Sequence, residues 1–235
     1  MKIALLGYGK MGKAIEVEAL AKGHEIVMKA NSQWTLFTNP KPEVAIEFSR
    51  PESAFENLKR CFEHGVPVVC GTTGWLENWS EAVELCNKNE GSLLYAPNFS
   101  IGVNLFFALN QTLAHWMCQY PEYVPGVFEA HHIQKLDKPS GTAVALLNQL
   151  LRALNGYSNW SLNKPEANEI GVEVLRSGEI TGTHIVRYKG PFDEIEITHK
   201  AHSRRGFALG ALMAAEWLVN KTGIYAMEDL LNLKK

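Results

Sequence analysis

Residues 1–12, Met-Lys-Ile-Ala-Leu-Leu-Gly-Tyr-Gly-Lys-Met-Gly, decide the fold of the first part of the chain. Lys2–Leu6 is a short apolar run typical of a buried strand, and Gly7–Gly12 has the spacing GxGxxG. Met11–Lys22 then has helical spacing and stops before Gly23, a residue suited to the left-handed conformation that follows a helix. The stretch therefore predicts a strand, a glycine turn and a helix, which together open a nucleotide-binding βαβ unit.

Each glycine of this turn has its own physical reason. Gly7 would allow the tight turn, Gly9 the close approach of a ligand to the backbone, and Gly12 the packing of the helix on the strand. A pyrophosphate would then lie at the helix N-terminus. GxGxxG alone is a weak motif, and a glycine turn without a ligand is the alternative, but its place between a strand and a helix favours a nucleotide site.

Short β-branched runs continue to alternate with amphipathic stretches over the first hundred residues, as in βαβ units around a parallel sheet. Strands are predicted at 24–29, 44–48, 66–70 and 93–96, and helices at 52–64 and 76–89. The helical, Ala- and Leu-rich stretch 206–220 could pack back on this part. We therefore expect a dinucleotide-binding domain made of residues 1–102 with 209–235.

Between these two parts the pattern changes to longer, more sheet-like runs. Strands are predicted at 126–132, 172–176, 183–188 and 194–202, helices at 103–116 and 142–154, and a polar loop at 156–165. The pattern predicts a second, α+β domain over residues 103–208 with a mixed or mostly antiparallel sheet.

Composition excludes several classes of protein. The 235 residues are 46% hydrophobic and 20% charged, which is enough for a sizeable core and excludes intrinsic disorder. The 23 basic and 25 acidic side chains leave no broad basic field for nucleic acid or an anionic membrane. No apolar run approaches the roughly 18 residues of a spanning helix, and no signal peptide is indicated. The four cysteines form no CxxC pair, which suits reduced thiols in the cytoplasm.

The second predicted strand lacks the acidic residue that often holds the ribose hydroxyls in such domains. It is followed by Asn31, whose amide could bind a hydroxyl without repelling a 2'-phosphate. Lys10, Lys13 or Lys29 could attract such a phosphate, although solvated lysines around a loop asparagine are the plainer interpretation. NADH, NADPH or both thus remain candidate cofactors.

A second glycine-rich turn, Gly71-Thr72-Thr73-Gly74, follows a predicted strand. It would lie at the carboxyl end of the sheet, where open α/β folds bind ligands. A turn without a ligand is the alternative.

The segment Glu129–Ala143, EAHHIQKLDKPSGTA, is the most informative in the chain. It holds two histidines, Lys135 four and three residues after them, and a Pro-Ser-Gly-Thr turn that opens a helix, so proton donors, a cation and an anion-binding helix terminus are close together. If the strand runs through His132, then His131 and His132 face opposite sides, and the pattern does not say which one addresses a substrate. A single histidine here would be an ordinary structural residue, but the cluster favours function. The spacing fits no metal site, so we expect no metal.

These segments, together with APNFSIGVN at 96–104 and ITHKAHSRRGFALGA at 197–211, resemble the 4-hydroxy-tetrahydrodipicolinate (dihydrodipicolinate) reductase family of bacterial diaminopimelate and lysine biosynthesis. The resemblance spans nearly the whole chain. It implies a Rossmann-type parallel-sheet domain and an α+β domain with a mixed sheet that binds substrate and forms a homotetramer.

The resemblance also implies residue roles. His131 would be the acid/base, Lys135 the proton donor and His132 a substrate contact, while the Ser140, Gly141 and Thr142 helix start would bind a substrate carboxylate. The residues that would hold the nicotinamide nucleotide are Gly7, Tyr8, Gly9, Lys10, Met11, Gly12, Asn31, Gly71, Thr72, Thr73, Ala96, Pro97, Asn98 and Phe99. Relatives often have an acidic residue in place of Asn31, so the cofactor preference stays open.

The implied reaction is hydride transfer from NADH or NADPH to C4 of a cyclic imine dicarboxylate, reached after loss of the 4-hydroxyl, followed by protonation by His131 or Lys135. An amino-acid or sugar dehydrogenase is a second hypothesis, but the HHxxKxDxPSGT run is not expected there. A non-catalytic NAD-binding sensor is a third. Such a sensor would be expected to lose His131 or Lys135, and both are present.

Overall fold

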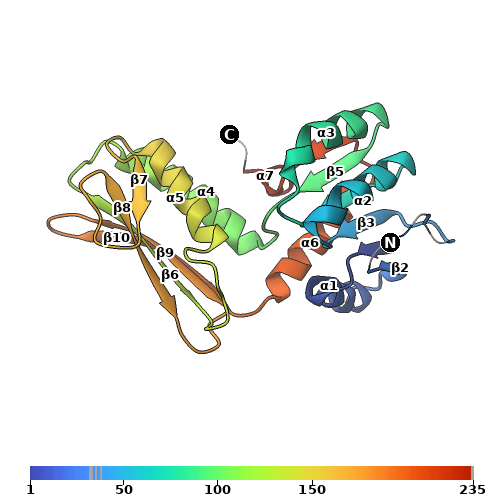
Figure 1. The fold of residues 1–235 in the computed structure, drawn as a ribbon, viewed down its shortest axis with the longest axis horizontal. Helices are drawn as coiled ribbons and strands as arrows, with labels where there is room; N and C mark the ends of the chain where they lie inside the picture. Colours follow the sequence, from blue (N-terminus) through green and yellow to red (C-terminus); the bar gives the residue numbers. More distant parts are fainter. Residues whose placement is uncertain (32–33, 35, 38, 234–235) are drawn as a thin grey trace. The chain divides into compact units, whose positions relative to one another are not determined.

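The computed structural model describes residues 1–31, 34, 36–37 and 39–233, and the chain forms two compact units (Figure 1). Unit 1 is Met1–Ile101 with Arg205–Lys235, and unit 2 is Gly102–Arg204. We expected the chain to return to the first domain at residue 209. It returns at Arg205 because α6, Arg205–Leu218, is one continuous helix whose buried face belongs to the core of unit 1.

Unit 1 is built on a six-stranded parallel sheet of order β11-β5-β4-β3-β1-β2. Its strands are β1 (Lys2–Leu6), β2 (Glu25–Ala30), β3 (Val44–Glu47), β4 (Val68–Cys70), β5 (Ser92–Tyr95) and β11 (Gly223–Tyr225). Its helices are α1 (Lys10–Ala21), α2 (Pro51–Glu63), the 3₁₀ turn η1 (Leu76–Asn78), α3 (Trp79–Lys88), α6 and α7 (Met227–Leu230).

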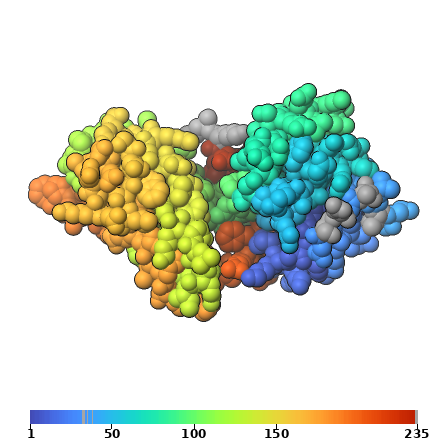
Figure 2. Space-filling view, viewed as in Figure 1, coloured from blue at the N-terminus to red at the C-terminus, as the bar shows by residue number. Residues whose placement is uncertain are grey.

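Helices cover both faces of this sheet, which explains why the inner strands β1, β3 and β4 are mostly apolar and buried. Ile3 and Leu5 pack in the core that α1 and α6 complete, whereas Ala4 and Leu6 pack against α2 and α3. In Figure 2 the orange atoms of α6 lie against the blue N-terminal part of the same unit. The expected Rossmann-type arrangement is confirmed.

Unit 2 contains a five-stranded sheet of order β10-β9-β6-β8-β7 and two long helices. Its elements are α4 (Ile101–Met117), β6 (Val124–His131), α5 (Gly141–Ala153), β7 (Asn159–Ser161), β8 (Glu169–Arg176), β9 (Gly182–Lys189) and β10 (Glu194–Ala201). β6 and β7 pair with β8 in parallel, whereas β9 pairs antiparallel with β6 and β10. The sheet is therefore mixed, as predicted.

One face of this sheet packs on α4 and α5. Val127 of β6 and Val186 of β9 join Phe106 and Leu146 of the helices in the core. Because alternate residues of a strand share a face, Glu129 and His131 lie on the same covered face as Val127, at the end of β6. Strand geometry thus brings a carboxylate and a histidine together under the helices.

Some short elements differ from those expected. β6 ends at His131 and does not continue through His132, so the premise that the two histidines alternate along one strand is wrong. β7 lies within the expected polar loop 156–165, and β11 and α7 follow α6. These elements have three or four residues, too few to show a period. Among the helices of the described residues, none is long and apolar enough to cross a membrane.

Candidate active site

The residues expected to bind a nucleotide follow the carboxyl ends of four strands of unit 1. Gly7–Gly12 follow β1, Asn31 follows β2, Gly71–Thr73 follow β4 and Ala96–Phe99 follow β5. Since the sheet is parallel, these ends lie along one edge. Strand order reverses between β1 and β3, which is where open α/β sheets form their ligand crevice.

A cavity of about 400 Å³ lies at this reversal point. Four of the expected residues line it: Gly7, Tyr8, Gly9 and Asn31. The sequence reasoning missed the other lining residues, which are Ala30, Trp34, Phe48, Ser49, Arg50, Ser53 and Asn57. Exposed Arg50 follows β3 directly before the proline that begins α2, and this placement after a strand was the signal that could have found it.

The glycines of the turn fit a bound nucleotide. Gly7 has φ +97°, and a Cβ there would overlap the carbonyl oxygen of Phe48; a Cβ at Gly12 would overlap the carbonyl of Gly7. At Gly9, which caps α1, no atom of the described residues lies within 4 Å of the Cβ position. This leaves open space beside a helix N-terminus, as a phosphate requires.

Lys29, one of the candidate phosphate ligands, is already paired. Its ammonium forms an ion pair with Glu16 and lies 4.8 Å from the centroid of the Tyr8 ring. The Tyr8 hydroxyl also donates to Glu16. Hydrogen bonding to Glu16 raises the pKa of Lys29, so the charge that it offers to a 2'-phosphate is largely compensated.

The wall of the cavity is fixed by a buried carboxylate at the end of β3. Glu47 accepts a hydrogen bond from Asn57 at 3.3 Å, and Asn57 in turn accepts one from the Trp34 indole at 2.8 Å. The Cys70 thiol donates to Glu47 at 3.3 Å. Burial and then the charge of Glu47 raise the pKa of Cys70, so this thiol stays protonated and unreactive.

The other expected nucleotide residues lie outside this cavity. Thr72 is buried and accepts a hydrogen bond from the Ser49 amide at 2.9 Å, and Phe99 is a core residue 5.6 Å from the Phe48 ring. The Asn98 side chain accepts from the Ser100 amide. Lys10, Thr73 and Pro97 are exposed, and Met11, Gly71 and Ala96 are half-buried or buried. Their cofactor roles stay predictions.

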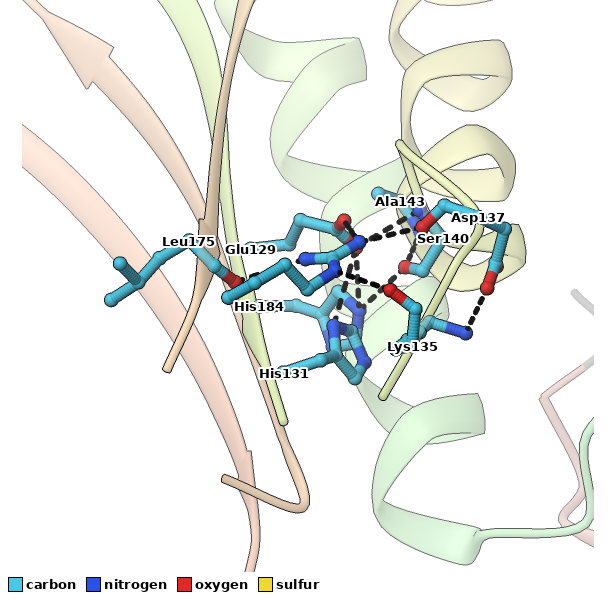
Figure 3. A network of polar contacts seen from close by, with 9 residues as sticks. Glu129, His131, Lys135, Asp137, Ser140, Ala143, Leu175 and His184 are labelled. Carbon is cyan, nitrogen blue, oxygen red and sulfur yellow. Dashed lines mark hydrogen bonds and ion pairs between the residues drawn. The ribbon is translucent and has the colours of Figure 1, made fainter. Parts of the chain in front are cut away.

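In unit 2 the segment 129–143 folds around the carboxylate of Glu129, which is fully buried (Figure 3). Its Oε1 accepts a hydrogen bond from Arg176 Nη2 at 2.7 Å, and its Oε2 accepts one from the Ser140 amide at 3.0 Å. Burial opposes ionisation of Glu129, but the hydrogen bonds from Ser140 and Arg176 outweigh it and lower its pKa. A negative charge is therefore stable in the interior.

His131 lies beside this charge. Its Nδ1 is 3.6 Å from Glu129 Oε2 and has no hydrogen-bond partner among the described residues, and its side chain is 9% exposed. Burial lowers the pKa of His131 and Glu129 opposes that shift. The imidazole is therefore neutral near pH 7 and lies beside a carboxylate that favours its protonated form, which suits a residue that exchanges a proton.

A second buried histidine, His184 of β9, completes the group. Its ring lies 5.1 Å from that of His131, and its Nε2 is hydrogen-bonded to Ser140 Oγ at 3.1 Å. Burial, followed by the charge of His131, lowers the pKa of His184 to about 4. His184 thus stays neutral down to about pH 4.

Lys135 lies in the loop between β6 and α5. Its ammonium forms an ion pair with Asp137 at 2.8 Å and is 24% exposed. Burial opposes ionisation of Asp137, but the hydrogen bond from Lys135 lowers its pKa. The cation is therefore held at the site by a partner that is itself largely open to solvent.

The start of α5 offers donors to an anion. Ser140 is the N-cap, and its Oγ accepts from the Ala143 amide at 3.2 Å. Gly141 and Thr142 occupy the first helical positions, whose N–H groups have no partner within the helix. His132, by contrast, is half-buried beyond the end of β6, and its Nδ1 has no partner among the described residues.

Glu129, His131 and His184 each offer an atom within 4.8 Å of the others, a spacing that a metal ion can bridge. Both oxygens of Glu129 already accept hydrogen bonds, one of them from a guanidinium. A divalent cation bound to Glu129 would have to displace the hydrogen bond from the Ser140 amide, and it would be repelled by the Arg176 guanidinium. The residues therefore fit an ion pair better than a metal site.

Sequence reasoning missed Glu129, Arg176 and His184 as members of the site. Glu129 could have been found from its position two residues before His131 on one strand. Arg176 and His184 come from β8 and β9, and only the register of the sheet places them there.

Comparisons with known proteins identify the family of the chain. Models of the dihydrodipicolinate reductase N-terminus and C-terminus match residues 1–99 and 102–231. A 4-hydroxy-tetrahydrodipicolinate reductase of Christiangramia forsetii is 47% identical over 234 residues, 99% of this chain and 98% of that protein. One of Methanoregula boonei is 37% identical over 219 residues, 91% and 84% of the two chains.

Solved structures show the same fold. A dipicolinate-bound dihydrodipicolinate reductase from Paenisporosarcina sp. TG-14 has a TM-score of 0.77 at 22% identity, covering 97% of this chain and 98% of that one. A probable dehydrogenase from Thermotoga maritima has a TM-score of 0.57 at 10% identity, covering 99% and 93%. From the two models and the full-length relatives, the chain belongs to the dihydrodipicolinate reductase family.

Proposed function

We propose that this protein reduces 4-hydroxy-tetrahydrodipicolinate to tetrahydrodipicolinate with NADH or NADPH, in diaminopimelate and lysine biosynthesis. The observation that supports it most is the meeting of His131, Lys135 and the start of α5 around buried Glu129. A proton source, a cation and an anion-binding helix terminus are what a dicarboxylate substrate and a protonation step need.

The nucleotide would be held at the carboxyl edge of the sheet in unit 1. Open space at Gly9 and the helix start behind it suit the pyrophosphate, and Asn31 on the cavity wall can bind a ribose hydroxyl. When bound, the reduced nicotinamide supplies a hydride to C4 of the cyclic imine.

The chain's own residues would handle the proton and the charges. His131 delivers the proton that the reduced ring requires, because it is buried beside a carboxylate that favours its charged form. The N–H groups of Gly141 and Thr142 bind one substrate carboxylate. Lys135 binds the other carboxylate or serves as a proton source, exchanging Asp137 for the substrate.

The second face of the sheet in unit 2 supports the expected homotetramer. Within the described residues, helices α4 and α5 cover one face, while Phe128, Ile185 and Arg187 line a shallow hollow of about 590 Å³ on the other. Val124 is 58% and Leu175 44% exposed. Association of copies through this face would bury these two side chains. If the protein is a homotetramer, sedimentation should give four times the mass of the chain.

We place the enzyme in the cytoplasm, consistent with its four free cysteines.

The reaction is tested by loss of reduced-nicotinamide absorbance, with substrate generated from pyruvate and aspartate semialdehyde. We expect substrate-dependent oxidation of NADH, NADPH or both. The control omits aspartate semialdehyde. If neither cofactor is oxidised although both bind, the protein is a nucleotide-binding sensor and the proposed reaction is wrong.

A further inference from the structure

We propose that the buried ion pair of Glu129 and Arg176 is the positioning device of the acid/base site. One pair holds His131, the loop that carries Lys135 and the start of α5 in fixed relation to one another. This inference rests on the proposed function for its kinetic consequences, but its direct test needs neither substrate nor cofactor.

Arg176 is placed to act on the loop. It is the register partner of His131 on the neighbouring parallel strand, and its side chain is 8% exposed. Besides Glu129, its guanidinium donates to the carbonyl of Asp137 at 2.7 Å, of Lys135 at 3.3 Å and of Leu175 at 2.9 Å. Two of these carbonyls belong to the loop. The planar Arg176 guanidinium therefore links the backbone of Lys135 to β8.

The two carboxylate oxygens of Glu129 contact different parts of the site. Oε1 holds Arg176. Oε2 accepts from the Ser140 amide, which fixes where α5 begins, and lies 3.6 Å from His131 Nδ1. When His131 takes up a proton, a shift of a few tenths of an ångström lets Nδ1–H donate to this oxygen. The same atom therefore orients the acid and the carboxylate-binding helix start.

Several charged or titratable groups face His131. They are Glu129 on β6, Arg176 on β8, His184 on β9, and Lys135 and Asp137 in the loop, with His199 of β10 acting on His184. Burial, Lys135 and Arg176 disfavour the imidazolium, and among these neighbours Glu129 favours it most. Removing the charge of Glu129 should therefore make His131 harder to protonate.

The first test is Glu129→Gln, which keeps the shape and an acceptor for the Ser140 amide but removes the charge. NMR titration of the His131 ring in the free protein should show its pKa fall by about one unit or more, the range for losing an opposite charge at this distance. In the reductase assay, the limb of kcat that requires protonated His131 should move to lower pH by the same amount. An unchanged His131 titration would overturn the proposal.

The second test is Arg176→Lys, which keeps the charge but cannot reproduce the fork. The KM for the substrate should rise roughly tenfold, as for loss of charge-assisted hydrogen bonds that place Lys135. The titration of His131 should stay close to that of the wild type. A KM within twofold of the wild-type value would show that the loop is placed without Arg176.

Controls separate positioning from general damage. Glu122→Gln removes an exposed carboxylate of unit 2 and should change neither the His131 titration nor KM. Glu129→Asp keeps the charge at a greater distance and should give a smaller fall of the His131 pKa than Glu129→Gln. If Glu129→Gln does not fold, Glu129→Asp and Arg176→Lys test the proposal instead. Wild-type values of the His131 pKa and of KM in both variants would then refute it. Because the titration needs no turnover, a shifted pKa in a protein that lacks reductase activity would refute the reaction and leave the positioning role standing.

Discussion

Unit 2 should lose stability in mild acid because of His184. Its side chain is almost fully buried, and its pKa in the folded protein is about 4, against the ordinary 6.5 expected in the unfolded chain. Below pH 6.5 the unfolded chain therefore binds a proton that the folded chain does not accept. A depressed histidine pKa thus costs stability as the pH falls from 6.5 towards 4, and costs almost nothing above pH 7.

The magnitude follows from these two values. The lost free energy is RT ln[(1 + 10^(6.5−pH))/(1 + 10^(4−pH))], which is about 2 kcal/mol at pH 5 and close to zero at pH 7. His184 alone should then remove about 2 kcal/mol of unfolding free energy between pH 7 and pH 5. Small domains have only about 5 to 15 kcal/mol in total, so this loss is measurable.

The perturbation is His184→Gln, whose amide nitrogen can still bond to Ser140 Oγ but does not titrate. Urea unfolding is followed through the amide NMR signals of β9, so that the transition belongs to unit 2. The stability lost between pH 7 and pH 5 should be about 2 kcal/mol smaller in the variant than in the wild type. Any pH-independent damage cancels in this comparison. His202→Gln, at an exposed histidine, should behave like the wild type. Equal losses in wild type and His184→Gln would refute the reasoning.

Other variants probe the proposed reaction and the cofactor preference. His131→Ala should lower kcat by about 10²- to 10⁴-fold while nucleotide affinity, measured by fluorescence titration, stays unchanged; activity within a few-fold of wild type would remove His131 as the acid. Lys135→Ala should lower kcat and raise KM together in steady-state assays, because one group binds a carboxylate and supplies a proton; unchanged constants would assign the carboxylate to another cation. Glu16→Gln releases Lys29 from its ion pair and should shift the ratio of dissociation constants towards NADPH. Asn31→Asp should shift the same ratio towards NADH by repelling the 2'-phosphate, and an unchanged ratio in both variants would place the 2'-position away from this strand.

Much of the fold could be predicted because its patterns are local. The apolar run at Lys2–Leu6, the glycine turn and the helix that follows it lie within about twenty residues, so periodicity alone indicates them. β7 and β11 could not be predicted, because three residues show no period. In addition, β11 pairs with β5, which lies far from it in the sequence.

The site divides in the same way. His131, Lys135 and Ser140 are neighbours in the sequence, and their chemistry is apparent there. Arg176 is 47 positions from Glu129, and only the parallel register of β6 and β8 brings the two side chains together. Lys29 was expected as a possible phosphate ligand, and its pairing with Glu16 depends on how α1 packs beside β2, which spacing alone does not reveal.

The late return of α6 to unit 1 bears on the order in which the protein folds as it is synthesised. Strands β1 to β5 are made first, yet the sheet face formed by Ile3, Leu5 and Leu94 is completed by residues of α6, which follow the whole of unit 2. Unit 2 is continuous in sequence and can close its own core as soon as β10 has been made. Until α6 has been made, the apolar face of the first sheet is exposed to water and can bind chaperones or aggregate. The unit whose sequence begins first is therefore expected to finish folding last.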